Sequence, residues 1–144
     1  MKVRTSIAAV AAAALVGTGA LMLPAIASAG TASHTLKFVS VEKASVNLSK
    51  TMIAQQDTDV SSSGKVIGYD ELYFAYGKTS AAGWATLDVD GGFIYATFTV
   101  NFKTGAITDG KVTGGARAFK GATGKLTAKD LSSTRTAVTI TYTT

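Results

Sequence analysis

The side chains of this sequence that could do chemistry are chiefly carboxylates, and they occur in two close pairs. Asp57 and Asp59 are separated by one residue, and Asp70 is followed directly by Glu71. A carboxylic acid whose pKa is raised by burial can act as a general acid, for example in a cyclisation. The alternative is that Asp57 and Asp59 are solvated in a loop, and that a strand directs only one of Asp70 and Glu71 inward. Asp57 and Asp70 are the catalytic candidates, and the sequence identifies no catalytic group beyond them.

Other common catalytic and metal-binding arrangements are missing from the sequence. His34 is the only histidine, and the chain contains no cysteine. A nucleophile triad built on histidine needs a positioned imidazole, and structural zinc sites are built from several Cys and His ligands. We therefore expect no metal and no cofactor, and we expect His34 to be a solvated residue of an N-terminal tail.

A glycine-rich stretch, TGGARAFKGATGKLTAKD at 113–130, contains GATGK, which superficially resembles a phosphate-binding loop. A P-loop requires glycine at position 119 and Ser or Thr at position 126, where this chain has Phe119 and Leu126. A dinucleotide-binding fingerprint also fails, because no βαβ pattern surrounds the glycines. The stretch instead predicts a strand–turn–strand corner, where glycine lets the backbone bend sharply.

The N-terminal region has the three parts of a secretory signal peptide. Lys2 and Arg4 precede an apolar run at 7–23, and Ala-Ser-Ala at 27–29 is a cleavage pattern. A retained membrane anchor is the alternative, but the run is short for a bilayer span and is interrupted by two glycines. We expect a signal peptide at 1–29, secretion to the extracellular space and no stable membrane anchor.

The remaining chain, 30–144, has the size of one domain and can bury a single core. Without cysteine, packing and backbone pairing must hold this domain together. Its net charge falls from +5 to +3 once Lys2 and Arg4 are removed, and the charges are scattered singly. Nucleic-acid-binding proteins cluster Lys and Arg on one face, so we expect no nucleic-acid partner.

The clearest secondary-structure signal is the period-two alternation of ATLDVDGGFIYATFTVNF at 85–102. Its first half alternates apolar with polar side chains, and Asp90-Gly91-Gly92 supplies the turn of a hairpin. The second half places one apolar set on a single face: Ile94, Ala96, Phe98, Val100 and Phe102.

Shorter segments also read as strands. Turns are predicted at 103–105 and at Asp109-Gly110, and the polar segment 55–64 is predicted to be a flexible loop. The segments 65–68 and 72–76 form either two strands or one strand with a bulge. The remaining predicted strands are 36–41, 45–49, 106–113, 124–129 and 136–143.

Seven to eight short strands separated by turn residues indicate an antiparallel sandwich or a closed barrel. Closure removes exposed strand edges, and eight strands enclose an interior just wide enough for side chains or one small ligand. Aromatic side chains on the inward faces either fill this interior or line a ligand cavity: Phe74, Tyr76, Phe98, Phe102 and Tyr142. Aromatic side chains on the outward faces indicate a subunit interface or a binding patch: Tyr73, Trp84, Phe93 and Tyr95.

The segment Asp109–Leu126 resembles the glycine corner shared by allene oxide cyclases and dirigent proteins. Lys65–Gly68 is similar to an early strand of the same family. The corner residues that match in order are Gly114, Gly115, Phe119, Gly121, Ala122 and Gly124. The resemblance implies a single all-β domain, an eight-stranded antiparallel barrel that is often trimeric and receives a small apolar molecule.

The chain also departs from that family. Thr123 stands where dirigent proteins commonly carry arginine, and Arg117 stands where the family usually has glycine. The proline, asparagine and glutamate attributed to the cyclase reaction cannot be placed, because 30–144 contains no proline. The resulting hypothesis is a secreted, homo-oligomeric barrel, trimeric by resemblance, that binds a small apolar molecule. The alternative is a cofactor-free cyclase or isomerase acting on a lipid, terpenoid or phenolic substrate.

Overall fold

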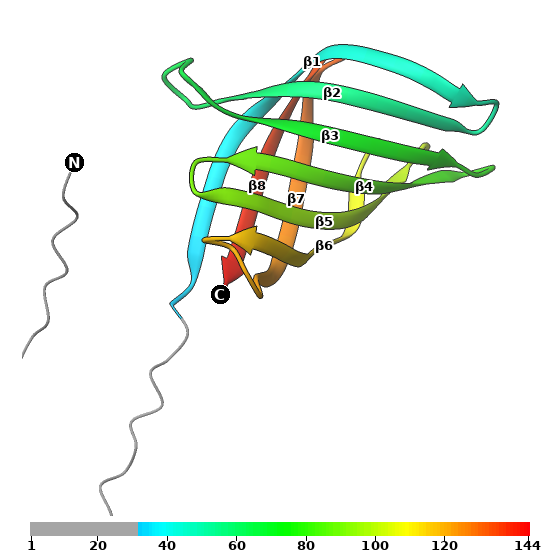
Figure 1. Ribbon diagram of the computed structural model, residues 1–144. Helices are drawn as coiled ribbons and strands as arrows, with labels where there is room; N and C mark the ends of the chain where they lie inside the picture. The colour runs from blue at the N-terminus through cyan, green and yellow to red at the C-terminus, as the bar shows by residue number, and fades with distance from the viewer. Residues whose placement is uncertain (1–31) are drawn as a thin grey trace, which may run out of the picture.

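The computed structural model describes residues 32–144, which form an all-β barrel (Figure 1). The predicted signal peptide at 1–29 lies outside the described residues. No helix able to cross a bilayer is found within residues 32–144. The eight strands are β1 (His34–Ser49), β2 (Met52–Val60), β3 (Val66–Tyr76), β4 (Ser80–Val89), β5 (Gly92–Asn101), β6 (Ile107–Arg117), β7 (Thr123–Ser132) and β8 (Arg135–Thr143).

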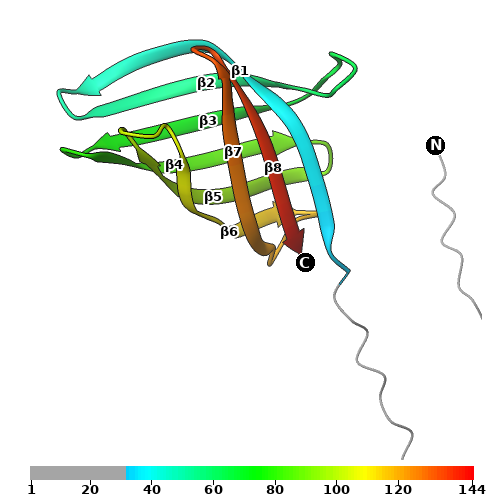
Figure 2. The same cartoon turned by 180° about the vertical axis from the view of Figure 1, so that it is seen from behind.

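Each strand pairs with the next one in antiparallel fashion, and β1 pairs with β8 to close the barrel. The predicted eight-stranded antiparallel barrel is therefore confirmed. Figures 1 and 2 show that β7 and β8 run steeply across the direction of β2–β6 on the opposite wall. The weakest seam lies between β6 and β7, where only Lys111 with Lys125 and Val112 with Gly124 are in register.

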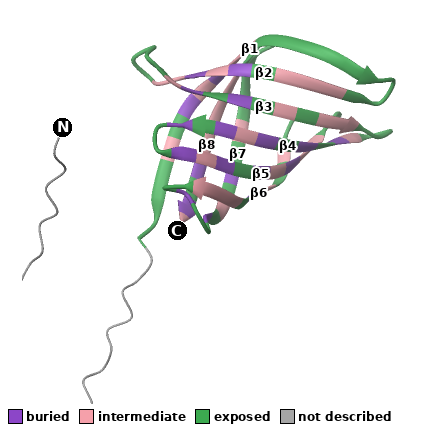
Figure 3. Ribbon diagram, viewed as in Figure 1, coloured by how far each residue is buried: buried purple, intermediate pink, exposed green. Residues whose placement is uncertain are grey.

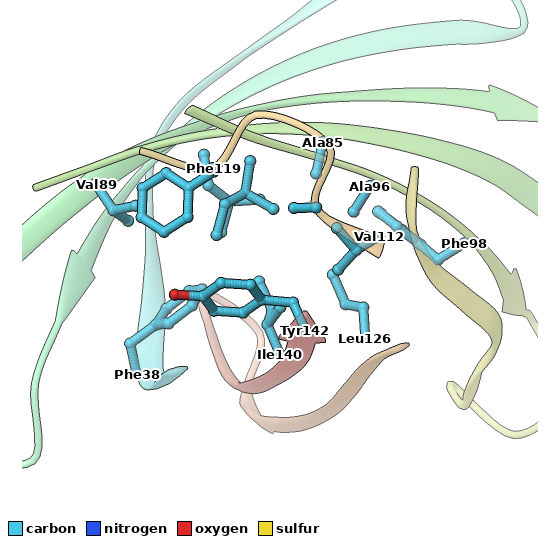
Figure 4. Packing of buried hydrophobic residues seen from close by; sticks show 13 residues of the cluster. Phe38, Ala85, Val89, Ala96, Phe98, Val112, Phe119, Leu126, Ile140 and Tyr142 are labelled. Atoms are coloured by element: carbon cyan, nitrogen blue, oxygen red, sulfur yellow. The ribbon is translucent and has the colours of Figure 1, made fainter. Parts of the chain in front are cut away.

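The two ends of the barrel differ. At one end, here called the open end, turns join β1 to β2, β3 to β4, β5 to β6 and β7 to β8. At the other end, the ring of Phe119 from the β6–β7 turn is buried and packs edge-on against Tyr142, with ring centroids 5.6 Å apart. The buried cluster in Figure 4, which includes Val89 and Ile140, fills the adjoining interior. We call this the closed end.

The predicted glycine corner is confirmed as the end of β6, a turn at 118–122 and the start of β7. Gly121 has a φ of 80°, and a Cβ at Gly124 would overlap the Thr141 carbonyl of β8. Arg117 also adopts a left-handed φ of 58°, a conformation that glycine enters most easily. This backbone geometry explains why glycine is usual at that position in the family that the segment resembles.

Several predicted boundaries were wrong because the strands are longer than their apolar segments. The segments 36–41 and 45–49 are one strand, β1. For 65–68 and 72–76 the one-strand alternative is confirmed as β3, and its bulge lies near the start of the strand, where the β2–β3 register shifts between Gly68 and Val66. Asp109-Gly110 is no turn but lies within β6, where the β5–β6 register shifts and Asp109 has a φ of 53°. The Asp-Gly pair is thus used in a bulge, which needs the same backbone freedom as a turn.

The prediction of a flexible loop at 55–64 was also wrong, since most of this segment belongs to β2. Only the turn after β2 is irregular, closed by the Ser61 amide donating to the Lys65 carbonyl at 2.8 Å. Three successive inward-facing residues of β2 are polar, namely Gln55, Asp57 and Asp59. Because polar residues occupy both faces, the strand lacks the alternation that sequence analysis relies on.

His34 is not part of a solvated tail but begins β1, opposite Tyr142 of β8. The two rings stack with centroids 5.3 Å apart, while the imidazole stays exposed. Figure 3 shows buried and exposed positions alternating along β2–β5, as a barrel wall requires. The predicted outward placement of four aromatics is confirmed: Tyr73, Trp84 and Tyr95 are about 40% exposed, and Phe93 lies under the Arg117 guanidinium at 5.8 Å.

Candidate functional site

A cavity of about 220 Å³ occupies the half of the barrel nearer the open end. Its wall is mostly apolar, with side chains such as Phe38, Leu72, Phe74, Leu87 and Phe98. Pockets for drug-sized ligands typically measure roughly 300–1,000 Å³. The cavity therefore suits a molecule of about one or two rings.

Four carboxylates interrupt this apolar wall. Glu42 comes from β1, Asp57 from β2, Asp70 from β3 and Asp130 from β7. No Lys, Arg or His is among the residues 32–144 that line the cavity. The wall of the cavity is thus mostly apolar, and the titratable side chains on it are all acidic.

Three aspartates are gathered where β2 and β3 pair. Asp57 is directly opposite Asp70 in the register, and Asp59 follows on the same face of β2. All three side chains are buried, and Asp59 is fully so. Strand alternation places Asp57 and Asp59 on the inward face of β2, and the β2–β3 register sets Asp70 beside them.

Two neighbours supply hydrogen bonds to this cluster. The Ser40 hydroxyl donates to Asp57 Oδ2 at 2.5 Å and also lies 3.3 Å from Asp70 Oδ2. Gln55 Nε2 donates to Asp57 Oδ1 at 2.8 Å. Asp57 is thus the carboxylate of the cluster with the most hydrogen-bond donors.

The other two aspartates lack such donors. Within residues 32–144, both carboxylate oxygens of Asp59 and Oδ1 of Asp70 are buried without a hydrogen-bond partner. Burial raises the pKa of Asp70 to about 8, with further increases from the charges of Asp59 and Asp57. Burial likewise raises the pKa of Asp59 to about 7, although the neighbouring Asp70 carboxyl, when it is protonated and can donate to Asp59, opposes this shift.

These shifts describe a pair that shares a proton. Two carboxylates this close cannot both ionise cheaply in a buried site, so the proton is held between them. A proton on Asp70 gives Asp59 the donor that it otherwise lacks. Asp70, which lines the cavity, is therefore an acid that still carries its proton near neutral pH.

The residues proposed from sequence are distributed along the barrel axis. Phe74 and Phe98 line the cavity, with ring centroids 5.8 Å apart in an edge-on arrangement. Tyr76 and Phe102 stack at 5.7 Å but are 40% and 44% exposed, beyond the cavity at the open end. Tyr142 is buried in the core at the closed end and does not line the cavity.

Unlike the aromatic candidates, the carboxylate candidates lie close together. Asp57 and Asp70 both line the cavity, whereas Glu71 faces outward and is exposed. Asp59 is not solvated in a loop but buried beside them. Several polar lining residues were not proposed from the sequence, among them Ser40, Glu42, Gln55 and Asp130. The first two share the inward parity of Phe38, which is the signal that could have located them.

Comparison with known proteins supports the fold and little beyond it. No known family and no curated protein sequence matches the chain. Among solved structures, a pyocyanin demethylase aligns with a TM-score of 0.65 at 19% identity, covering 76% of this chain and 100% of the other. A pterocarpan synthase dirigent protein aligns with a TM-score of 0.62 at 14% identity, covering 78% and 88%. The dirigent-type barrel fold predicted from the glycine corner is confirmed.

Proposed function

We propose that this protein is a secreted barrel that binds a small, largely apolar molecule in the cavity near its open end. The observation that carries the proposal is the cavity itself, walled by Phe38, Phe74 and Phe98. An apolar wall with a few polar groups is typical of small-molecule sites. The names of the two structural neighbours, a pyocyanin demethylase and a pterocarpan synthase dirigent protein, each refer to a small molecule.

Native mass spectrometry of the protein purified from its own source tests this proposal. We expect a co-purified molecule whose mass adds to that of the chain. Ala128→Phe should displace the molecule, because Ala128 lines the cavity and a phenyl ring would occupy it. Ala82→Phe is the control, because Ala82 lies on the exposed face of β4. An empty wild-type barrel that also binds no small aromatic compound when titrated would refute the proposal.

Secretion is proposed from the N-terminal residues. The charged start, apolar run and Ala-Ser-Ala site predict cleavage after Ala29. Intact-mass analysis of the protein in the culture medium should find a chain that begins at Gly30. A secreted species that still begins at Met1 would contradict this expectation.

A cofactor-free cyclase or isomerase is the second candidate function, and the protonated Asp70 favours it. Such an enzyme can act by holding a reactive conformer while one acid donates a proton to it. Once the bound molecule is known, conversion should decline as the pH rises through about 8, where Asp70 loses its proton. If Asp57→Asn and Asp70→Asn convert the substrate as fast as the wild type, carboxylate-assisted chemistry is excluded. Binding without any conversion would support a carrier.

A further inference from the structure

We propose that the cavity selects a positively charged ligand, a flat molecule of one or two rings that carries a cationic nitrogen. This inference rests on the proposed function, that the cavity binds a small molecule, and adds the charge of that molecule. It makes a cationic ring compound the preferred occupant over a neutral one of the same shape.

The charge of the lining is the first argument. Glu42, Asp57, Asp70 and Asp130 face the cavity, and no basic side chain of the described residues lines it. A neutral apolar molecule gains nothing from these carboxylates, two of which, Asp57 and Asp70, are buried and therefore costly to keep in an apolar wall. An anion would be repelled by every one of the four that is ionised. A cation is the one class of ligand that the arrangement attracts.

The unpartnered carboxylate oxygens are the second argument. Asp70 is 5% exposed, lines the cavity, and its Oδ1 has no hydrogen-bond partner within residues 32–144. Buried polar atoms are nearly always satisfied, so an orphaned one indicates a missing partner. A cationic group next to Asp70 would take the place of the proton that Asp70 shares with Asp59, and would leave a positive charge beside the ionised carboxylates.

The aromatic rings are the third argument. Phe38, Phe74 and Phe98 line the same cavity as the carboxylates. Aromatic faces attract organic cations, and the attraction strengthens where water is excluded. A bare metal ion is a poorer occupant, because no group of three or more ligating side chains within residues 32–144 is arranged to hold one.

The titration of the cluster provides an independent signature. A bound cation lowers the pKa of Asp70 and Asp59, so binding at neutral pH should release protons and strengthen as the pH rises through the range of about 7 to 8 in which they titrate. β4, β5 and β8 present no titratable group to the cavity. The titratable groups that act on Asp70 are Asp57 and Asp59 of β2, and the remaining titratable groups on the cavity wall are Glu42 of β1 and Asp130 of β7.

Isothermal titration calorimetry with three two-ring probes tests the inference. The probes are N-methylquinolinium, 2-methylquinoline, which is uncharged under alkaline conditions, and naphthalene-1-carboxylate. At a pH of about 8.5 we expect the cation to bind at least about tenfold more tightly than the neutral probe, and the carboxylate not to bind. Asp57→Asn and Asp70→Asn should each reduce this preference, whereas the outward-facing Asp88→Asn should leave it unchanged.

If a variant fails to fold, the inference can still be tested on the wild-type protein alone. Titrations in buffers of different ionisation enthalpy report proton release on binding of N-methylquinolinium. Proton release supports the inference, and its absence at neutral pH overturns it. Equal or tighter binding of 2-methylquinoline overturns the cation preference but leaves the small-molecule proposal intact. Failure of all three probes to bind folded protein overturns both.

Discussion

The buried positions of Asp59 and Asp70 lower the stability of the folded protein, which is unusual for residues that only fill space. A buried carboxyl that stays protonated in the folded state contributes no favourable charge interaction, and its ionisation opposes folding. Packing alone would be served better by neutral side chains at these two positions. This cost at residue scale is the reason to assign the cluster to function.

Replacing Asp70 by asparagine is expected to stabilise the protein at alkaline pH. The folded-state pKa is raised from 3.8 to about 8, so wild-type stability is lost as the pH rises through that interval. The side chain introduced by Asp70→Asn cannot ionise, and its amide can donate to Asp59 as the protonated acid does. The gain in unfolding free energy should be small at a pH of about 4 and about 2 kcal/mol at a pH of about 8.5.

Urea denaturation at several pH values measures this difference. Asp88→Asn is the matched control, because Asp88 is exposed on β4 and should show no such trend. A stability difference between Asp70→Asn and the wild type that does not change with pH would show that Asp70 is ionised throughout.

At the scale of single strands, the cavity depends on one glycine of β4. Gly83 is opposite Phe98 of β5, and a Cβ at Gly83 would overlap the Phe98 ring. Gly83→Ala should push this ring from its site, cost about 1–3 kcal/mol of stability and weaken binding of any cavity ligand. Gly114→Ala is the control, because its Cβ would meet only Tyr95 at an ordinary 3.7 Å. Equal unfolding free energies for the two variants would refute this account.

The β6–β7 turn is expected to hold the closed end through Phe119. This ring is 7% exposed and packs on Tyr142, whereas Phe102 at the open end is 44% exposed. Phe119→Ala should lower the free energy of unfolding by about 3–5 kcal/mol, because it leaves a void in the core. Thermal and urea denaturation should show a much smaller loss for Phe102→Ala. A similar loss in both variants would mean that the two ends are equally packed.

At the scale of the whole molecule, we propose that the outer aromatic residues form a homo-oligomer interface. Trp84 and Tyr95 are about 40% exposed on neighbouring strands, an unusual surface for a monomer. Light scattering at micromolar concentration should give a mass above that of one chain, a trimer by resemblance. Trp84→Lys combined with Tyr95→Lys should reduce it to a monomer, while Thr127→Lys at an exposed position of β7 should not. A strictly monomeric wild type would contradict the proposal.

The all-β class, the hairpin at 85–102 and the glycine corner were determined by the sequence alone. The alternation of apolar and polar residues around Leu87 and Ile94 indicates which face of the hairpin points inward. The glycines at 121 and 124 indicate a left-handed turn and a close approach of two backbones. Such signals depend on residues near one another in the chain. Asp57 and Asp70 could be proposed from their type alone.

Only the tertiary structure decided that 55–60 is a strand and that its aspartates form one cluster with Asp70. β2 carries polar residues on its inward face, which is the pattern of a loop unless the partner strands are known. The register with β1 and β3 brings Ser40 and Asp70 to Asp57, and barrel closure removes water from around them. The raised pKa values arise from that burial, which is a property of the closed barrel and of no single segment.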